Sequence, residues 1–458
     1  MSSTGTLVDG EFTPADVEAF SFTQWRFTAE RGELQLSYAL DEMGFTETVV
    51  FPNGRRTPFQ QSMDRDALNR SCQLAHWLAG ISYFKAALPR KVQFHSGQPG
   101  PRCAALLGQV YRQGLGEMVW RSGLDLPAEH LISPGAKPSP APSVSAGADG
   151  VVVPLGGGKD SLVTCDLLHS AGIAFRTIAV GRSPLIMAMA NELEQRGVSQ
   201  GHIQISRTLD PRLIALNKIG AYNGHVPITG VLAGLMLVAG VIYGFDTIVM
   251  SNERSADAAN LLSADGQAIN HQYSKSAEFE SAFQSALTSE VLTGFRYFSL
   301  LRGASEIAIA RHFSTLKGWF SHFSSCNQNF RQDGKTPKDR WCGHCPKCRF
   351  VFLALAPTLG PEPLAEIFAA NLLDQESQTQ GFRALCGLTE HKPFECVGEV
   401  EESAALMKHL AQHPSWRQCQ VVEQLGPQVS DAANLDDFYS SSLPSSIPAE
   451  FAPVLRRL

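Results

Sequence analysis

The sequence has no excess of basic charge. It contains 38 lysines and arginines against 44 aspartates and glutamates, a formal net charge of −6, and its isoelectric point is about 6.1. Proteins that bind phosphate-rich polymers over a large surface need a strongly basic face. A large nucleic-acid partner is therefore not expected, although a local basic patch is compatible with this average.

The start of the chain lacks the features of a secretory signal. The residues MSSTGTLVDGEF contain neither a basic beginning nor an apolar run, and both are needed for export. We therefore expect a cytoplasmic protein.

One uncharged segment approaches the length of a membrane span. Residues 228–245 read ITGVLAGLMLVAGVIYGF, but the segment holds four glycines, lacks basic flanks and leads directly into Asp246 and the strand-like TIVMS. A helix buried against a parallel sheet has the same apolarity, because helices in a layered α/β domain are covered on most sides. We expect a buried helix and no membrane partner.

The length of 458 residues and the 44% hydrophobic content predict two or more domains. Residues 133–149 are rich in Pro, Ser and Ala and read as a linker. Upstream, residues 1–132 combine strand-like and helix-like segments, which predicts an α+β domain. Downstream, short apolar strands alternate with helical segments, which is typical of a doubly wound parallel sheet.

The strongest motif opens this downstream region. A strand-like segment, GVVVPL, is followed by a glycine loop and then by helical spacing to residue 171. Consecutive glycines let backbone N–H groups approach an anion closely, and the helix N-terminus adds a favourable dipole. Phosphate binding is the expected use, with the lysine as a point charge, the serine as a hydroxyl donor and the aspartate as a ligand of Mg²⁺. The glycine loop consists of Gly156, Gly157, Gly158, Lys159, Asp160 and Ser161.

Spacing excludes two other phosphate loops. A Walker A loop needs glycine at Val153 and Ser or Thr at Asp160, and the dinucleotide fingerprint needs Gly or Ala at Ser161. The alternative without function is a tight turn between a strand and a helix that binds no ligand.

The glycine loop resembles the S-G-G-x-D-S signature of the PP-loop ATP pyrophosphatases, with Gly156 in place of the first serine. This resemblance implies a HUP-like α/β fold that cleaves ATP between the α- and β-phosphates. In that fold the segment after a later strand, here TIVMSNE, lines the nucleotide cleft. Asn252 and Glu253 are thereby assigned to the site; the plain alternative is that they cap the following helix.

A group of cysteines forms the second strong signal. Four of the ten cysteines follow a C-x15-C-x2-C-x2-C pattern, which is typical of a closed structural zinc site, and His344 could replace one of them. A disulfide framework is not expected in a reducing compartment. We refer to these four residues as the cysteine cluster: Cys326, Cys342, Cys345 and Cys348. We expect five of the remaining cysteines to be packed as small apolar groups: Cys72, Cys103, Cys165, Cys386 and Cys419.

A PP-loop domain followed by such a cluster resembles 7-cyano-7-deazaguanine synthase. The whole arrangement is more similar to the MurL family, epimerases that act on UDP-N-acetylmuramoyl-L-alanyl-L-glutamate. The shared features are the N-terminal domain, the loop LGGGKDS, the block WCGHCPKC and the segment KPFECVGE. The resemblance implies a PP-loop domain over residues 150–320, and a zinc-knuckle and C-terminal region over residues 321–458.

The resemblance also implies a reaction of peptidoglycan precursor synthesis. The terminal L-glutamate of UDP-MurNAc-L-Ala-L-Glu would be adenylated by ATP with Mg²⁺, epimerised to D-glutamate and released by hydrolysis, with AMP and pyrophosphate as products. Glu395 and Cys396 are candidates for proton transfer, with His391 and His225 behind them. The plain alternative is that Cys396 is a packing residue and Glu395 a solvated charge.

Two further functions stay open. Another PP-loop enzyme, either the nitrile synthase or a tRNA-thiolating enzyme, is one; a thiolating enzyme would be expected to carry a basic face and an exposed reactive cysteine. A nucleotide-binding, zinc-stabilised module without turnover is the other, but the loop retains Asp160 and Ser161, which serve metal and phosphate handling more than loop geometry.

Overall fold

A computed structural model describes residues 11–125, 131–143, 150–263, 266, 268–330, 339–430 and 434–458. The chain forms two compact units. Unit 1 contains Met1–Ser145, Ile205–Tyr243 and Ala282–Phe295, and unit 2 contains Ala146–Gln204, Gly244–Ser281 and Arg296–Leu458. The described part of the predicted linker, residues 133–143, contains no named helix or strand, and residues 144–149 lie outside the described part.

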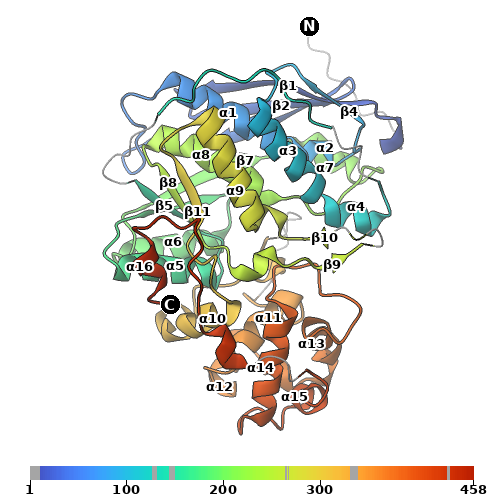
Figure 1. The fold of residues 1–458 in the computed structure, drawn as a ribbon, viewed down its shortest axis with the longest axis vertical. Helices are drawn as coiled ribbons and strands as arrows, with labels where there is room; N and C mark the ends of the chain where they lie inside the picture. The colour runs from blue at the N-terminus through green and yellow to red at the C-terminus, as the bar shows by residue number, and fades with distance from the viewer. Residues whose placement is uncertain are drawn as a thin grey trace. The chain divides into compact units, whose positions relative to one another are not determined.

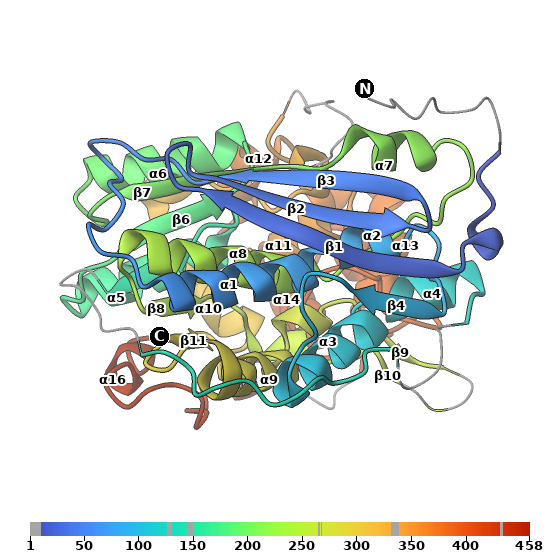
Figure 2. The ribbon, with the colours of Figure 1, turned by 90° about the horizontal axis from the view of Figure 1, so that it is seen from above.

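Unit 1 is built on a mainly antiparallel sheet with the strand order β7-β3-β2-β1-β4 (Figure 2). The first three strands form a meander, in which Phe20 of β1 faces Leu40 of β2, and β4 adds in parallel to β1. Alternate residues such as Leu34 and Leu36 are buried, as period-two patterning requires. The strands are β1 (Ala19–Thr28), β2 (Glu33–Leu40), β3 (Met43–Val50), β4 (Lys91–Phe94) and the last residues of β7 (His202–Thr208).

The helices of unit 1 are α1 (Arg65–Ala79), α2 (Ile81–Phe84), α3 (Pro101–Gln113), α4 (Gly116–Ser122), α7 (Pro211–Leu216), α8 (Ile228–Tyr243) and the end of α9 (Ala277–Ala286). Among them, α1 and α2 contact this sheet, and α8 contains the apolar segment.

Helix α8 is buried along nearly its whole length and packs against α1. A Cβ atom at Gly234 would lie 3.1 Å from the Cα atom of Ala75, so glycine permits the close approach of the two helices. Of the described helices, none combines the length and the apolarity that crossing a bilayer requires.

Unit 2 contains a parallel sheet, which confirms the predicted α/β class. Strand β5 lies between β8 and β6, and β11 lies on the other side of β8. Because the strands are parallel, their carboxyl ends meet at one edge of the sheet. The strands are β5 (Val151–Pro154), β6 (Arg176–Val180), β8 (Thr247–Met250) and β11 (Arg296–Ser299); β9 (Leu261–Leu262) and β10 (Ala268–Ile269) form a separate short pair.

Helices α5 and α10 pack against each other, and α11 packs against α10. The helices from α11 to α15 gather into a cluster (Figure 1) that shares one hydrophobic core with α5 and α10. The helices of unit 2 are α5 (Lys159–Ser170), α6 (Pro184–Gln195), α10 (Glu306–Thr315), α11 (Pro346–Leu355), α12 (Pro361–Phe368), α13 (Thr379–Leu385), α14 (Val400–Gln412), α15 (Gln420–Leu425) and α16 (Ala452–Leu455).

Candidate active site

Three neighbouring strands of unit 2 each place an acidic residue just beyond their carboxyl end. Asp160 follows β5, Glu253 follows β8 and Glu306 follows β11. Their carboxylate oxygens all lie within 4.8 Å of one another. We call these three residues the carboxylate trio. Oxygen donors at this spacing fit a hard divalent cation such as Mg²⁺.

The glycine loop connects β5 to α5, as its sequence predicts. Gly157 has φ +81°, a conformation that favours glycine, and its carbonyl accepts a hydrogen bond of 2.9 Å from the Ser324 N–H. Gly158 is the N-cap of α5 and supplies no side chain to its first turn. A helix N-terminus presented by a glycine turn is a suitable anion cradle, and Ser161 lies within it, with its hydroxyl 3.3 Å from the carbonyl oxygen of Gly158.

Lys159 is buried and pairs with the carboxylate trio. Its ammonium donates hydrogen bonds to Asp160 and to Glu306. Burial alone would lower the pKa of Lys159, but these two carboxylates outweigh it and raise the pKa above its usual range. Burial raises the pKa of Glu306, and Lys159 opposes that shift. The lysine thus offsets part of the repulsion within the trio.

The segment after β8 is buried and polar. The Asn252 side chain donates a hydrogen bond of 3.0 Å to the Ser299 hydroxyl, and Glu253 makes no side-chain hydrogen bond to the N–H groups of the 3-10 turn that follows it. Glu253 thus occupies the N-cap position of this turn without making the capping hydrogen bond. Next to them, the buried hydroxyl of Ser251 has no hydrogen-bond partner among the described residues. An orphaned polar atom beside the glycine loop fits a site built for a polar ligand.

Cys396 is held beside a cation. The Lys275 ammonium lies 3.2 Å from the Cys396 sulfur. Burial alone would raise the pKa of Cys396, but Lys275, Lys347 and His271 together lower it to about 6. Burial alone would likewise lower the pKa of Lys275, but Cys396, Glu253 and Asp160 raise it. Lys275 therefore links the thiol electrostatically to the carboxylate trio, and this setting favours the thiolate form of Cys396.

The other candidates for proton transfer are placed differently. The Asn327 side chain donates a hydrogen bond to Glu395, which holds this carboxylate beside the start of the cysteine cluster. His391 is exposed, and His225 belongs to unit 1. Cys396, by contrast, contacts the ammonium of Lys275.

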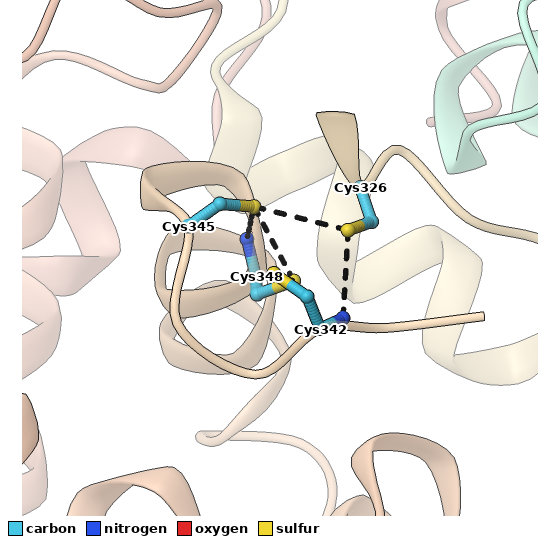
Figure 3. Close-up of side chains that lie close together, drawn as sticks. All are labelled: Cys326, Cys342, Cys345 and Cys348. Carbon is cyan, nitrogen blue, oxygen red and sulfur yellow. Dashed lines mark hydrogen bonds between the residues drawn. The ribbon is translucent and has the colours of Figure 1, made fainter. Parts of the chain in front are cut away.

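The cysteine cluster brings its four thiols together (Figure 3). The sulfur of Cys348 lies 3.4 Å from that of Cys345 and 3.7 Å from that of Cys342, and the sulfur of Cys326 lies 4.0 Å from that of Cys345. Four sulfurs around one zinc with bonds of about 2.3 Å would be separated by about 3.8 Å. The donor set therefore fits a tetrahedral metal.

His344 lies outside this group of sulfurs, because it is exposed and its Nδ1 contacts the carbonyl oxygen of Cys342 at 2.7 Å. None of the ten cysteines forms a disulfide, and the five that were predicted to pack as apolar groups are buried.

The sequence reasoning missed three residues of the site, namely Glu306, Lys275 and Glu402. One oxygen of the buried Glu402 accepts hydrogen bonds from the N–H groups of Glu306 and Ile307, so it positions the start of α10. The signal for Glu306 was its place at a helix start after a strand. No local pattern marks the other two, because their partners are distant in the sequence.

Comparisons with known proteins agree with the resemblance of the motifs. A family model described as the MurL N-terminal domain matches residues 11–300, and one described as the MurL C-terminal domain matches residues 322–439.

Three relatives are named UDP-N-acetyl-alpha-D-muramoyl-L-alanyl-L-glutamate epimerase. The protein of Xanthomonas oryzae pv. oryzae is 40% identical over 415 residues, which cover 90% of each chain. Those of Salinispora tropica and a Micromonospora species are 35% and 36% identical and cover 96% of this chain and 96% and 98% of their own.

Proposed function

Because the chain belongs to the MurL family, we propose that it is an epimerase that converts the terminal L-glutamate of UDP-MurNAc-L-Ala-L-Glu to D-glutamate. The reaction consumes ATP, passes through an acyl-adenylate and releases AMP and pyrophosphate. The names of the relatives support the epimerisation and the small-molecule substrate. The geometry of unit 2 supports the use of ATP.

The need for ATP follows from the acidity of the α-carbon. Removing the α-proton beside a free carboxylate would place a second negative charge next to the first. Once the carboxylate is a mixed anhydride with AMP, its carbonyl oxygen can accept the electron pair as an enolate. A base then removes the α-proton and an acid returns one on the opposite face. Water hydrolyses the adenylate and frees the D-glutamate product.

The observation that carries the ATP-dependent step is the carboxylate trio beside the glycine loop. In this proposal the glycine loop binds the phosphates, and Asn252 and Glu253 line the nucleotide site. Mg²⁺ held by the trio would neutralise phosphate charge during adenylyl transfer. Lys159 is paired with Asp160 and Glu306, so its contribution is to hold the trio in place until the cation and the phosphates share it.

For proton transfer we propose the thiolate of Cys396. It combines a low pKa with a cationic partner, Lys275, and a base whose pKa lies near the working pH is the most effective one. Glu395 is assigned a supporting role in holding the same segment, through its hydrogen bond from Asn327.

We assign zinc to the cysteine cluster as a structural ion, because four protein ligands leave no open position for substrate. A reaction that draws on ATP belongs in the cytoplasm, and we retain that location as part of the proposal.

The other PP-loop activities and the module without turnover predict different products. A nitrile synthase or thiolating enzyme would form AMP with another acid or with tRNA, and a binding module would form none. Purified protein should therefore be incubated with ATP, Mg²⁺ and UDP-MurNAc-L-Ala-L-Glu in deuterated water. We expect AMP, pyrophosphate and D-glutamate that carries deuterium at the α-carbon. Formation of ADP, or epimerisation without ATP, would contradict the proposal.

A further inference from the structure

Lys392 is a buried lysine that has no direct ion-pair partner among the described residues. Only 6% of its surface is exposed, and among the residues that the structure describes it makes no hydrogen bond and no ion pair. The two other lysines of the site are both engaged, Lys159 with two carboxylates and Lys275 with a thiolate. Lys392 therefore differs from them in keeping its ammonium protons available.

The charges of the proposed site act on Lys392. Burial lowers the pKa of Lys392, and the charges of Glu402, Glu253, Glu399 and Glu306 oppose that shift. Two of these glutamates belong to the carboxylate trio. All of them lie in unit 2 with Lys392. The acidic region that we assign to the nucleotide therefore acts electrostatically on Lys392.

The backbone around Lys392 is held in place. The carbonyl of Pro393 accepts a hydrogen bond of 2.8 Å from the Asn260 side chain and one of 2.8 Å from the Glu395 N–H. Cys396, four residues further on, is bonded to Lys275. One short, fixed segment therefore carries both a thiolate that is paired and an ammonium that is not.

A lysine side chain that is largely buried and whose ammonium has no protein partner is costly, and such groups gather at functional sites more than elsewhere. Inversion of the α-carbon requires a proton donor, which is a role that this lysine can fill. A thiolate can remove the α-proton from one face, but a second group that still carries a proton must deliver it to the other face. A thiolate at Cys396 and an ammonium at Lys392 would be the two complementary forms that this requires.

We propose that Lys392 is a catalytic residue of this reaction, the acid that returns a proton to the α-carbon on the face opposite Cys396; the inference rests on the proposed function. The Cys396 sulfur takes the α-proton, and the electron pair of the C–H bond moves into the enolate. That pair then forms a new C–H bond with a proton from Lys392 Nζ, which leaves a neutral amine and a thiol. Both groups return to their starting forms by exchanging protons with water.

The test is Lys392→Gln with UDP-MurNAc-L-Ala-L-Glu, ATP and Mg²⁺ in deuterated water. We expect AMP release within about threefold of wild type, because adenylation precedes proton transfer. Recovered glutamate should be L and carry deuterium, since Cys396 still exchanges the α-proton. The amount of D-glutamate formed per AMP should fall by about 10²-fold or more. The exposed Lys317→Gln is the matched control and should change neither quantity.

The variant Lys392→Arg separates the effect of proton donation from the effect of positive charge. It also provides the test if the glutamine variant is unstable. Its guanidinium keeps the charge but does not release a proton near neutrality, so it should also make AMP without D-glutamate. Recovery of inversion in this variant would overturn the assignment. A parallel loss of AMP release and of D-glutamate in both variants would make Lys392 a nucleotide-binding residue and overturn it too. Wild-type protein that forms no AMP would overturn the proposed function together with this inference.

Discussion

The ammonium of Lys275 lies 3.2 Å from the sulfur of Cys396, although 121 positions separate the two residues in the chain. A thiol in this setting loses its proton readily, because the cation stabilises the thiolate. The same lysine is influenced by Glu253 and Asp160. The contact therefore connects the segment proposed for proton transfer with the edge of the sheet proposed for ATP.

Replacing Cys396 with serine should separate the two halves of the reaction. A hydroxyl is too weak an acid to supply a base near neutrality, so α-proton exchange should fall by about 10²- to 10⁴-fold. AMP formation should persist, because adenylation does not use the thiol. Deuterium incorporation and AMP release, measured in one sample, check this. Cys419→Ser serves as the control, and exchange that survives in the Cys396 variant would exclude the thiolate as base.

The rate of α-proton exchange should depend on pH through the same thiolate. The pKa of Cys396 is lowered from 9.0 to about 6, and only the deprotonated form accepts a proton. Exchange should therefore fall as the pH drops through about 6 and level off above it. In Lys275→Met, Lys347 and His271 would remain, so the midpoint should move upward by at least about one pH unit. An unchanged midpoint would show that another group titrates.

Replacing Glu306 with glutamine should weaken the step that uses ATP. The change removes one carboxylate of the trio but leaves Lys159 bonded to Asp160. We expect pyrophosphate release to fall by about tenfold or more and to require more Mg²⁺. A titration with Mg²⁺ measures both effects, and the exposed Glu362→Gln should behave as wild type. Normal release at low Mg²⁺ would remove Glu306 from the site.

The cysteine cluster should contain about one zinc ion per chain. Cys345→Ser should lose this ion and lower the melting temperature by roughly 5–10 °C, since binding energy of a structural metal is folding energy. Elemental analysis and thermal unfolding measure the two effects, and Cys419→Ser should retain the metal. Wild-type protein that is free of metal and equally stable with a chelator would contradict the assignment.

The features of this protein that could be predicted from the sequence are those formed by residues close together in the chain. The glycine loop combines a strand, a turn and a helix start within about a dozen positions, and the pattern holds in the structure. The burial of α8 could be predicted from its apolar sequence and its lack of basic flanking residues. The cysteine spacing predicted a cluster, and the four thiols do meet.

The sequence by itself determined the α/β class, the glycine loop, the cysteine group and the family, because each of these depends on short-range spacing or on similarity along the chain. Only the tertiary structure decided which distant residues join them. Glu306 reaches Asp160 because β5, β8 and β11 run parallel and end at one edge. Lys275 reaches Cys396 because the fold brings together two segments that are remote in the sequence. Contacts between residues so far apart in the sequence depend on the packing of the whole core, and no local sequence pattern predicts them.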